Sequence, residues 1–518
     1  MKIDFENISQ RILALPLPAR NYKGLYAGKS NALFVMEGPT VDPLGGDGPE
    51  ECTVQKFDLT KRKVEKFAEK AKAFAVANNR EKVLYQKGED WFLTGAEGAA
   101  KDGDGQLKLD GFQIAVDPRA EWRQMYHETW RIERDFFYDP GHHGLDIKAS
   151  EARYQPYLEE LSSRSDLNFL FEEMLGEMTV GHMFVGGGDQ PEVKHVKVGL
   201  LGADYSIDNG RYRFARIYDG ENWNPDLRAP LTEPGINVAV GDYLLAVDGR
   251  ELPGTAEIYS FFQDKADKLV TLRVGPNADG TGAREVKVKP VDDEDGLRNR
   301  AWVEENRRTV DRLSSNRLAY LHLPDTHAGG YKAFNRYFFA QIDKQGFVID
   351  ERFNHGGLLA DYFVDYLHRK VLSNIANREG ADYSLPLGAS AGPKVMIINE
   401  FAGSGGDALP WYFRKLGIGP LVGRRTWGGL VGIGGYPQLM DGGRVTAPHE
   451  AVYGTEGQYE VENKGVAPDF DVELDPKAWR AGRDLQLEKA VQVALESLAA
   501  NPPAPFKRPP YPNYHPQP

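Results

Sequence analysis

The chain has 518 residues, with 63 Lys or Arg against 76 Asp or Glu, and a formal net charge of −13 at pH 7. At about 100 to 200 residues per domain, this length holds three or four domains, which excludes a single small binding module. The acidic balance gives no overall attraction to nucleic acid or to an anionic membrane surface. The one cysteine, Cys52, allows neither an internal disulfide nor a thiolate metal cage.

The first 20 residues mix charged and apolar side chains and lack the basic-then-apolar pattern of a signal peptide. No window approaches the roughly 18 uncharged apolar residues of a membrane helix, and the mean hydropathy is −0.50. We therefore expect a cytoplasmic protein that binds neither membrane nor nucleic acid.

Residues 1–117 consist of short β-rich runs such as 24–36, 52–59, 82–86 and 91–94, separated by turn residues. Their spacing is typical of β-propeller blades, but 117 residues make only two or three blades at about 40 to 45 residues each. We expect a partial β-propeller here, and we expect the chain to be the C-terminal portion of a longer protein that completes it.

Residues 118–193 are predicted to form a helical segment. Apolar side chains recur at helical spacing over 119–137, and further helical patterns cover 151–161 and 166–178. The segment ends by delivering His182 to the start of a short strand.

Residues 194–291 return to a β pattern. The run G-D-Y-L-L-A-V-D-G at 241–249 resembles the corresponding stretch of PDZ domains, which bind extended peptides by adding a strand to a sheet edge. A strand at 269–274 and a short helix near 255–265 are expected around it.

Strands and helices alternate over residues 292–499, which predicts an α/β layer with parallel strands. The fold class is therefore multidomain α+β: a partial β-propeller, a helical segment, a PDZ-like β domain and an α/β domain with a mostly parallel sheet. Residues 500–518 form a proline-rich tail. The α/β layer is expected to contain strands at 318–323, 346–350 and 395–399 and helices at 358–369, 406–415 and 485–499.

A candidate nucleophile stands where the strand 395–399 runs through A-G-S-G-G into a helix. A serine on such a turn, Ser404, has an exposed hydroxyl, and the helix N-terminus offers free amides to an oxyanion. The alternative is an ordinary N-cap or turn serine.

A second glycine-rich turn, N-H-G-G at 354–357, follows the strand 346–350. Neighbouring parallel strands bring both turns to one carboxyl edge of the sheet, where α/β proteins bind ligands. The amides of Gly357 and Gly405 can then form a two-donor oxyanion hole, unless the second turn is only a tight connection.

The order of the motifs resembles the tricorn protease family over nearly the whole chain. Four stretches carry the resemblance besides His182 and the PDZ-like insert: N-H-G-G at 354–357, A-G-S-G-G at 402–406, G-R-R-T-W-G-G at 423–429 and V-E-N-K-G-V-A-P-D at 461–469. The resemblance implies that Ser404 is the nucleophile and His182 the general base. It also implies that Glu462 is the carboxylate behind the histidine and that Gly357 and Gly405 are the oxyanion donors.

The sequence departs from the family at Gly181, where tricorn has a serine that links the histidine to the glutamate. Glu462 must then reach His182 directly, through water, or not at all. His182 can also be read as a buried structural histidine and Glu462 as a solvated surface acid. Glycine at 429 replaces the lysine of the related Ser/Lys processing peptidases, and no metal-ligand spacing is found.

The predicted function is a serine endopeptidase or oligopeptidase that needs no cofactor or metal and cuts short or unfolded peptides by Ser/His acyl transfer. The alternative is a catalytically silent scaffold that binds peptides through its PDZ domain. The resemblance also implies a homo-oligomer, a hexamer in the family.

Overall fold

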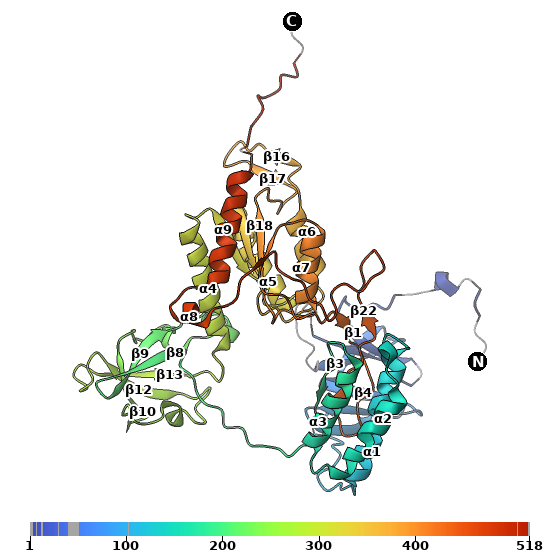
Figure 1. The fold of residues 1–518 in the computed structure, drawn as a ribbon. Helices are drawn as coiled ribbons and strands as arrows, with labels where there is room; N and C mark the ends of the chain where they lie inside the picture. Colours follow the sequence, from blue (N-terminus) through green and yellow to red (C-terminus); the bar gives the residue numbers. More distant parts are fainter. Residues whose placement is uncertain are drawn as a thin grey trace. The chain divides into compact units, whose positions relative to one another are not determined.

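The computed structural model describes residues 4–6, 8–11, 14–29, 31–39, 51–101, 103–504 and 506–515. The chain divides into two compact units, Met1–Asp117 and Pro118–Pro518 (Figure 1).

The first unit is one antiparallel sheet whose strands follow one another in sequence order. Its core is aromatic, with Phe34, Phe67 and Phe74 packed edge to face. The predicted β architecture is confirmed, and the assignment of these strands to propeller blades stays a prediction. The strands are β1 (Tyr22–Ala27), β2 (Ala32–Glu37), β3 (Cys52–Asp58), β4 (Lys63–Val76), β5 (Lys82–Lys87) and β6 (Asp90–Gly95).

The second unit begins with the helical segment, as the sequence predicts. Tyr126 and Trp130 of α1 pack against Leu167 and Phe171 of α3. The short strand β7 (Val185–Gly186) pairs with β21 (Arg444–Val445), so a loop from the α/β part of the chain is bound to this segment. The helices are α1 (Pro118–Phe136), α2 (Ile147–Tyr154) and α3 (Arg164–Leu175).

The PDZ-like region forms a sheet of the order β13-β12-β10-β9-β8, with β11 beside β10. The helix expected near 255–265 is wrong in type and length, because only Ile258–Phe261 is helical, as one 3-10 turn. The strands are β8 (Ala203–Asp208), β9 (Arg211–Ile217), β10 (Tyr243–Val247), β11 (Arg250–Glu251), β12 (Val270–Gly275) and β13 (Arg284–Val288).

The last part of the unit is an α/β layer whose five-stranded sheet has the order β14-β15-β18-β19-β23, all parallel, which confirms the prediction. Its strands are β14 (Leu318–His322), β15 (Gly346–Asp350), β18 (Lys394–Ile398), β19 (Leu421–Gly423) and β23 (Phe470–Asp471).

Helices cover both faces of this sheet (Figure 1). Alternate strand residues explain this: Phe347 and Ile349 pack under α5, α6 and α7, whereas Val348 packs under α4 and α9. The helices are α4 (Asp295–Leu313), α5 (Ala328–Tyr337), α6 (Ala360–His368), α7 (Gly405–Lys415), α8 (Pro476–Arg480) and α9 (Leu485–Ala500).

Small two-stranded pairs and the tail complete the unit. The pairs are β16 (Ser373–Ile375) with β17 (Tyr383–Leu385) and β20 (Val431–Gly432) with β22 (Glu450–Ala451). Tail residues 501–504 and 506–515 contain no helix or strand, while residue 505 and residues 516–518 of the predicted tail lie outside the described residues. Among the helices described, none has the length and apolar character needed to cross a bilayer.

Candidate active site

Ser404 stands between the end of β18 and the first residue of α7. Its backbone has φ 56° and ψ −117°, a conformation that costs energy in any residue with a side chain. Its carbonyl accepts the first helical hydrogen bonds, but its side chain makes no capping bond. The capping interpretation therefore does not account for the hydroxyl, which is left available for chemistry.

Gly357 and Gly405 lie against each other beside Ser404, as the parallel pairing of β15 with β18 predicts. A Cβ on Gly405 would stand 1.9 Å from Thr326 Oγ1 and 2.8 Å from the Gly357 nitrogen. Gly357 has φ +129°, and its Cβ would stand 2.4 Å from the Thr326 carbonyl oxygen. Only glycine fits at either position.

The amides of these two glycines are free to bind a ligand. Within the described ranges, neither the Gly357 nor the Gly405 nitrogen donates a hydrogen bond. Asn354 fixes both turns, because its side-chain oxygen accepts from the Gly356 amide at 2.9 Å and its carbonyl accepts from the Gly403 amide at 3.1 Å. Two free amides next to a serine hydroxyl match the donor arrangement of an oxyanion hole.

His182 is buried, with only 7% of its surface exposed, and has a φ of 60°. Burial lowers the pKa of its imidazole below the ordinary value of 6.5. Its Nδ1 atom is buried and has no hydrogen-bond partner among the residues that the structure describes. The lowered pKa favours the neutral form of the ring, which is the form that a proton acceptor needs.

The Trp427 indole packs on three glycines and joins the serine turn to the histidine loop. A Cβ on Gly403, Gly429 or Gly181 would stand 2.6, 2.3 or 3.1 Å from an atom of this ring. The His182 ring lies beside the indole, with 5.3 Å between centroids. The bare backbone at the three glycines is what allows the indole to lie there.

Glu462 holds the other side of the histidine loop. One carboxylate oxygen accepts from the Gly181 amide at 2.7 Å, and the other accepts from the Leu430 amide at 2.5 Å. Glu462 therefore binds the residue before His182 rather than the ring itself.

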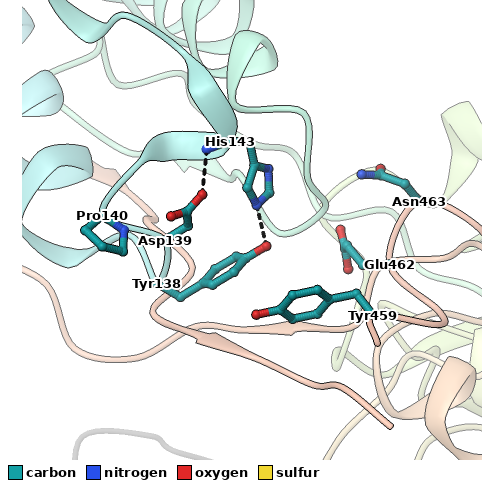
Figure 2. Close-up of a pocket in the computed structure, with 7 residues that line it drawn as sticks. All are labelled: Tyr138, Asp139, Pro140, His143, Tyr459, Glu462 and Asn463. Carbon is teal, nitrogen blue, oxygen red and sulfur yellow. Dashed lines mark hydrogen bonds between the residues drawn. The ribbon is translucent and has the colours of Figure 1, made fainter. Parts of the chain in front are cut away.

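A cavity of about 530 Å³ has Glu462 among the residues that line it. Figure 2 shows the Glu462 carboxylate facing Tyr138 and His143, with the Tyr459 side chain beside Glu462. The Tyr138 hydroxyl bonds His143 Nε2 at 2.5 Å. The pKa of Tyr138 is raised to about 12, mainly by burial and further by Tyr459 and the charge of Glu462.

The structure gathers all five predicted site residues around loop 427–430, but not into a continuous chain of hydrogen bonds. The Ser404 amide donates to the Gly429 carbonyl at 3.0 Å, and His182 and Gly181 pack on Trp427. Among the described residues, no hydrogen bond joins Ser404 to His182 or His182 to Glu462.

Three domain models match consecutive parts of the chain: the Tricorn protease C1 domain over residues 118–176, the Tricorn protease PDZ domain over 199–293 and Peptidase family S41 over 317–472. Tricorn protease homolog 1 of Streptomyces coelicolor is 34% identical over 97% of this chain and 48% of its own length. The Tricorn protease homolog of Saccharolobus solfataricus is 31% identical over 95% of this chain and 46% of its own.

A crystal structure of the tricorn protease superposes with a TM-score of 0.85 and 28% identity, covering 92% of this chain and 47% of that one. The chain is similar to the tricorn proteases over nearly its whole length. It spans about half the length of the curated relatives it matches.

Asp407 is a residue of the site that sequence reasoning missed. Its buried carboxylate accepts from the Thr426 hydroxyl and from the amides of Gly428 and Gly429 at 2.8 and 3.0 Å, so it ties α7 to loop 426–429. Burial raises the pKa of this carboxyl, and the three donated bonds oppose that rise. The only signal in the sequence was an acid in the first turn of a helix, which usually indicates capping.

Proposed function

We propose that the chain is a serine peptidase that hydrolyses peptides at Ser404. The observation that carries this proposal is the Ser404 turn, where a strained serine with an unused hydroxyl adjoins two unbonded amides. Strain of this kind persists where surrounding structure enforces it, and it concentrates at active sites. The S41 peptidase domain that spans this turn supports the same chemistry.

In the proposed reaction, His182 accepts the Ser404 proton while the serine oxygen attacks the peptide carbonyl carbon. The amides of Gly357 and Gly405 donate to the oxyanion that forms. Protonated His182 then gives its proton to the leaving amine, and water hydrolyses the acyl enzyme with His182 again as the base.

Glu462 acts in this proposal by holding the Gly181 amide, which orients the loop that carries His182. Asp407 and Trp427 position the facing loop. We further propose that the substrates are short or unfolded peptides, cut as an endopeptidase or oligopeptidase, in the cytoplasm and in a homo-oligomer.

A fluorophosphonate probe tests the chemistry, because it phosphonylates only an activated serine, with fluoride as the leaving group. We expect labelling of the wild-type chain and none of the Ser404→Ala variant, with unchanged thermal unfolding, because the hydroxyl caps no helix. Ser384→Ala, on strand β17, is the matched control and keeps the label. Absence of labelling in the wild type would instead favour a silent peptide-binding scaffold.

The substrate class is tested separately with peptides of increasing length and an unfolded protein. Mass spectrometry of the products distinguishes internal cuts from trimming at one end, and the Ser404→Ala chain supplies the blank. Light scattering of the same sample gives the number of copies in the assembly.

A further inference from the structure

A second cavity of about 330 Å³ lies at the carboxyl edge of β14 and β15. We call it the aromatic pocket, because its walls are mainly rings. Its lining includes Trp302 of α4, Trp479 of α8, Phe353, His322, His355 and Pro324. Parallel sheets bind their ligands at this edge.

The aromatic pocket shares its backbone with the catalytic turns. Phe353 and His355, on its wall, flank Asn354, which bonds the Gly356 and Gly403 amides. The Phe353 ring also stacks on Phe401, three residues before Ser404, with 5.5 Å between centroids. A ligand in the pocket is therefore adjacent to the turns that would hold the scissile carbonyl.

Phe353 adopts a left-handed backbone with a φ of 62°, which is unusual for a bulky residue. Its amide donates to the Asn399 side chain at 3.0 Å, a bond between the ends of the two central strands. The surrounding structure thus enforces a strained conformation that places an aromatic ring at the pocket wall, as expected for a functional position.

The other side chains of the wall are held by packing and hydrogen bonds. Trp302 packs edge to face on His322 at 4.8 Å and lies under the Arg352 guanidinium at 5.4 Å. His322 is buried and its Nε2 bonds the Arg352 carbonyl at 3.0 Å, and burial lowers its pKa. No Asp, Glu, Lys or Arg lines the pocket among the described residues.

We propose that the aromatic pocket binds one apolar side chain of the peptide substrate, aromatic or branched aliphatic, close to the bond that is cut. This inference rests on the proposed peptidase function and adds a substrate preference to it. The volume is at the lower end of the range for ligand sites, so the pocket suits a side chain rather than a whole small molecule. Burying a Leu or Phe side chain strengthens binding roughly ten- to a hundredfold.

Trp479→Ala tests the pocket, because Trp479 is 40% exposed and lies on α8, which contributes none of the proposed catalytic residues. The substrates are quenched peptides that differ only in Leu, Phe or Gly at each position near the cut. We expect the wild type to prefer Leu or Phe at one position and Trp479→Ala to lose roughly tenfold of that preference. Trp223→Ala, whose side chain is 80% exposed outside the pocket, is the control and keeps the preference.

Two further measurements separate the pocket from the chemistry. The Ser404→Ala chain should bind the Leu peptide more tightly than the Gly peptide, measured by Trp fluorescence without turnover. Trp479→Glu, which places a charge in the pocket lining, should remove this difference even if Trp479→Ala unfolds. Equal binding of the Leu and Gly peptides, or an undiminished preference in both Trp479 variants, overturns the proposal. A binding preference without hydrolysis by the wild type would leave the pocket standing and reject the proposed function.

Discussion

The nucleophile half of the site, Ser404 with the amides of Gly357 and Gly405, comes from two turns on neighbouring parallel strands. The base half, His182 with Glu462, depends on a hydrogen bond between residues 281 positions apart in the sequence. The first half is fixed by close backbone contacts that admit only glycine. The second half is held by one hydrogen bond to each oxygen of the Glu462 carboxylate and by packing of His182 on Trp427. Changes at the two glycines of the first half should therefore damage structure and rate together, whereas changes at Ser404 or in the second half should mainly affect rate.

The largest effect is expected in the base half. His182→Ala removes the proposed general base, and kcat should fall by about ten-thousandfold or more. Because the imidazole Nδ1 has no hydrogen-bond partner among the described residues, the loss of folding stability should reflect only lost packing. Steady-state kinetics with thermal unfolding check both statements. A variant within about tenfold of wild type would show that another group is the base.

In the nucleophile half, Gly405→Ala forces a Cβ to within 1.9 Å of Thr326 Oγ1 and 2.3 Å of the Gly357 carbonyl oxygen. We expect a hundred- to thousandfold fall in kcat, the usual scale for losing one oxyanion donor, together with a lower unfolding temperature. Gly176→Ala is the control, because nothing lies within 4 Å of its added Cβ and its φ of −57° suits alanine. Equal behaviour of the two variants would contradict the proposed oxyanion site.

The nucleophile half of the site could be predicted from the sequence, whereas the contacts of the base half could not. Strand β15 (Gly346–Asp350) and helix α7 (Gly405–Lys415) follow from local apolar patterns and glycine turns, so the serine and both amides were placed correctly at one edge. The bonds that Glu462 makes were not predictable, because they join loops distant in sequence. The packing of Trp427 on three glycines was missed for the same reason.

Local propensity also failed in the first unit. Strand β4 (Lys63–Val76) is rich in Lys, Glu and Ala, residues that favour a helix. Pairing with β3 and β5 and burial of Phe67 and Phe74 decide its conformation instead. The β prediction for this unit was confirmed, but this strand was not among the predicted ones.

The pH dependence tests the base half without any mutation. Because burial lowers the pKa of His182, activity should persist below pH 6.5 and then fall about tenfold per pH unit beneath the folded-state pKa. His182 should also make the folded state less stable as the pH falls. Between pH 6.5 and the lower folded-state pKa, the unfolded chain binds a proton at this residue more readily than the folded chain, so the free energy of unfolding decreases over that range. An acid limb centred above pH 6.5 would contradict a buried neutral base.

Glu462→Gln should have a smaller effect than His182→Ala. The amide side chain has one acceptor, so it keeps a bond to either Gly181 or Leu430 and turns its NH₂ group toward the other amide. A lost bond to a charged acceptor is worth about 1.5 kcal/mol or more, which corresponds to roughly tenfold in kcat if the loop positions His182. Separate measurement of kcat and KM for Glu462→Gln checks this, because the fall is expected in kcat. A drop as large as that of His182→Ala would mean that the charge itself acts in the reaction.

The smallest expected effect is the difference between two substitutions at position 181. A Cβ at position 181 would stand 3.0 Å from the Gly429 Cα and 3.1 Å from the Trp427 ring, so Gly181→Ala and Gly181→Ser suffer the same crowding. The serine alone adds a hydroxyl, on a Cβ only 3.4 Å from Glu462 Oε1 and on the residue next to His182 with its unbonded Nδ1. If the carboxylate can influence the base through that space, the serine variant should have a kcat several-fold higher than the alanine variant, in keeping with about 1 kcal/mol for one added hydrogen bond. Its acid limb should also move toward higher pH, because a link to the carboxylate favours the charged imidazole. Identical rates and pH profiles for the two variants would show that Glu462 acts only on the backbone of the histidine loop.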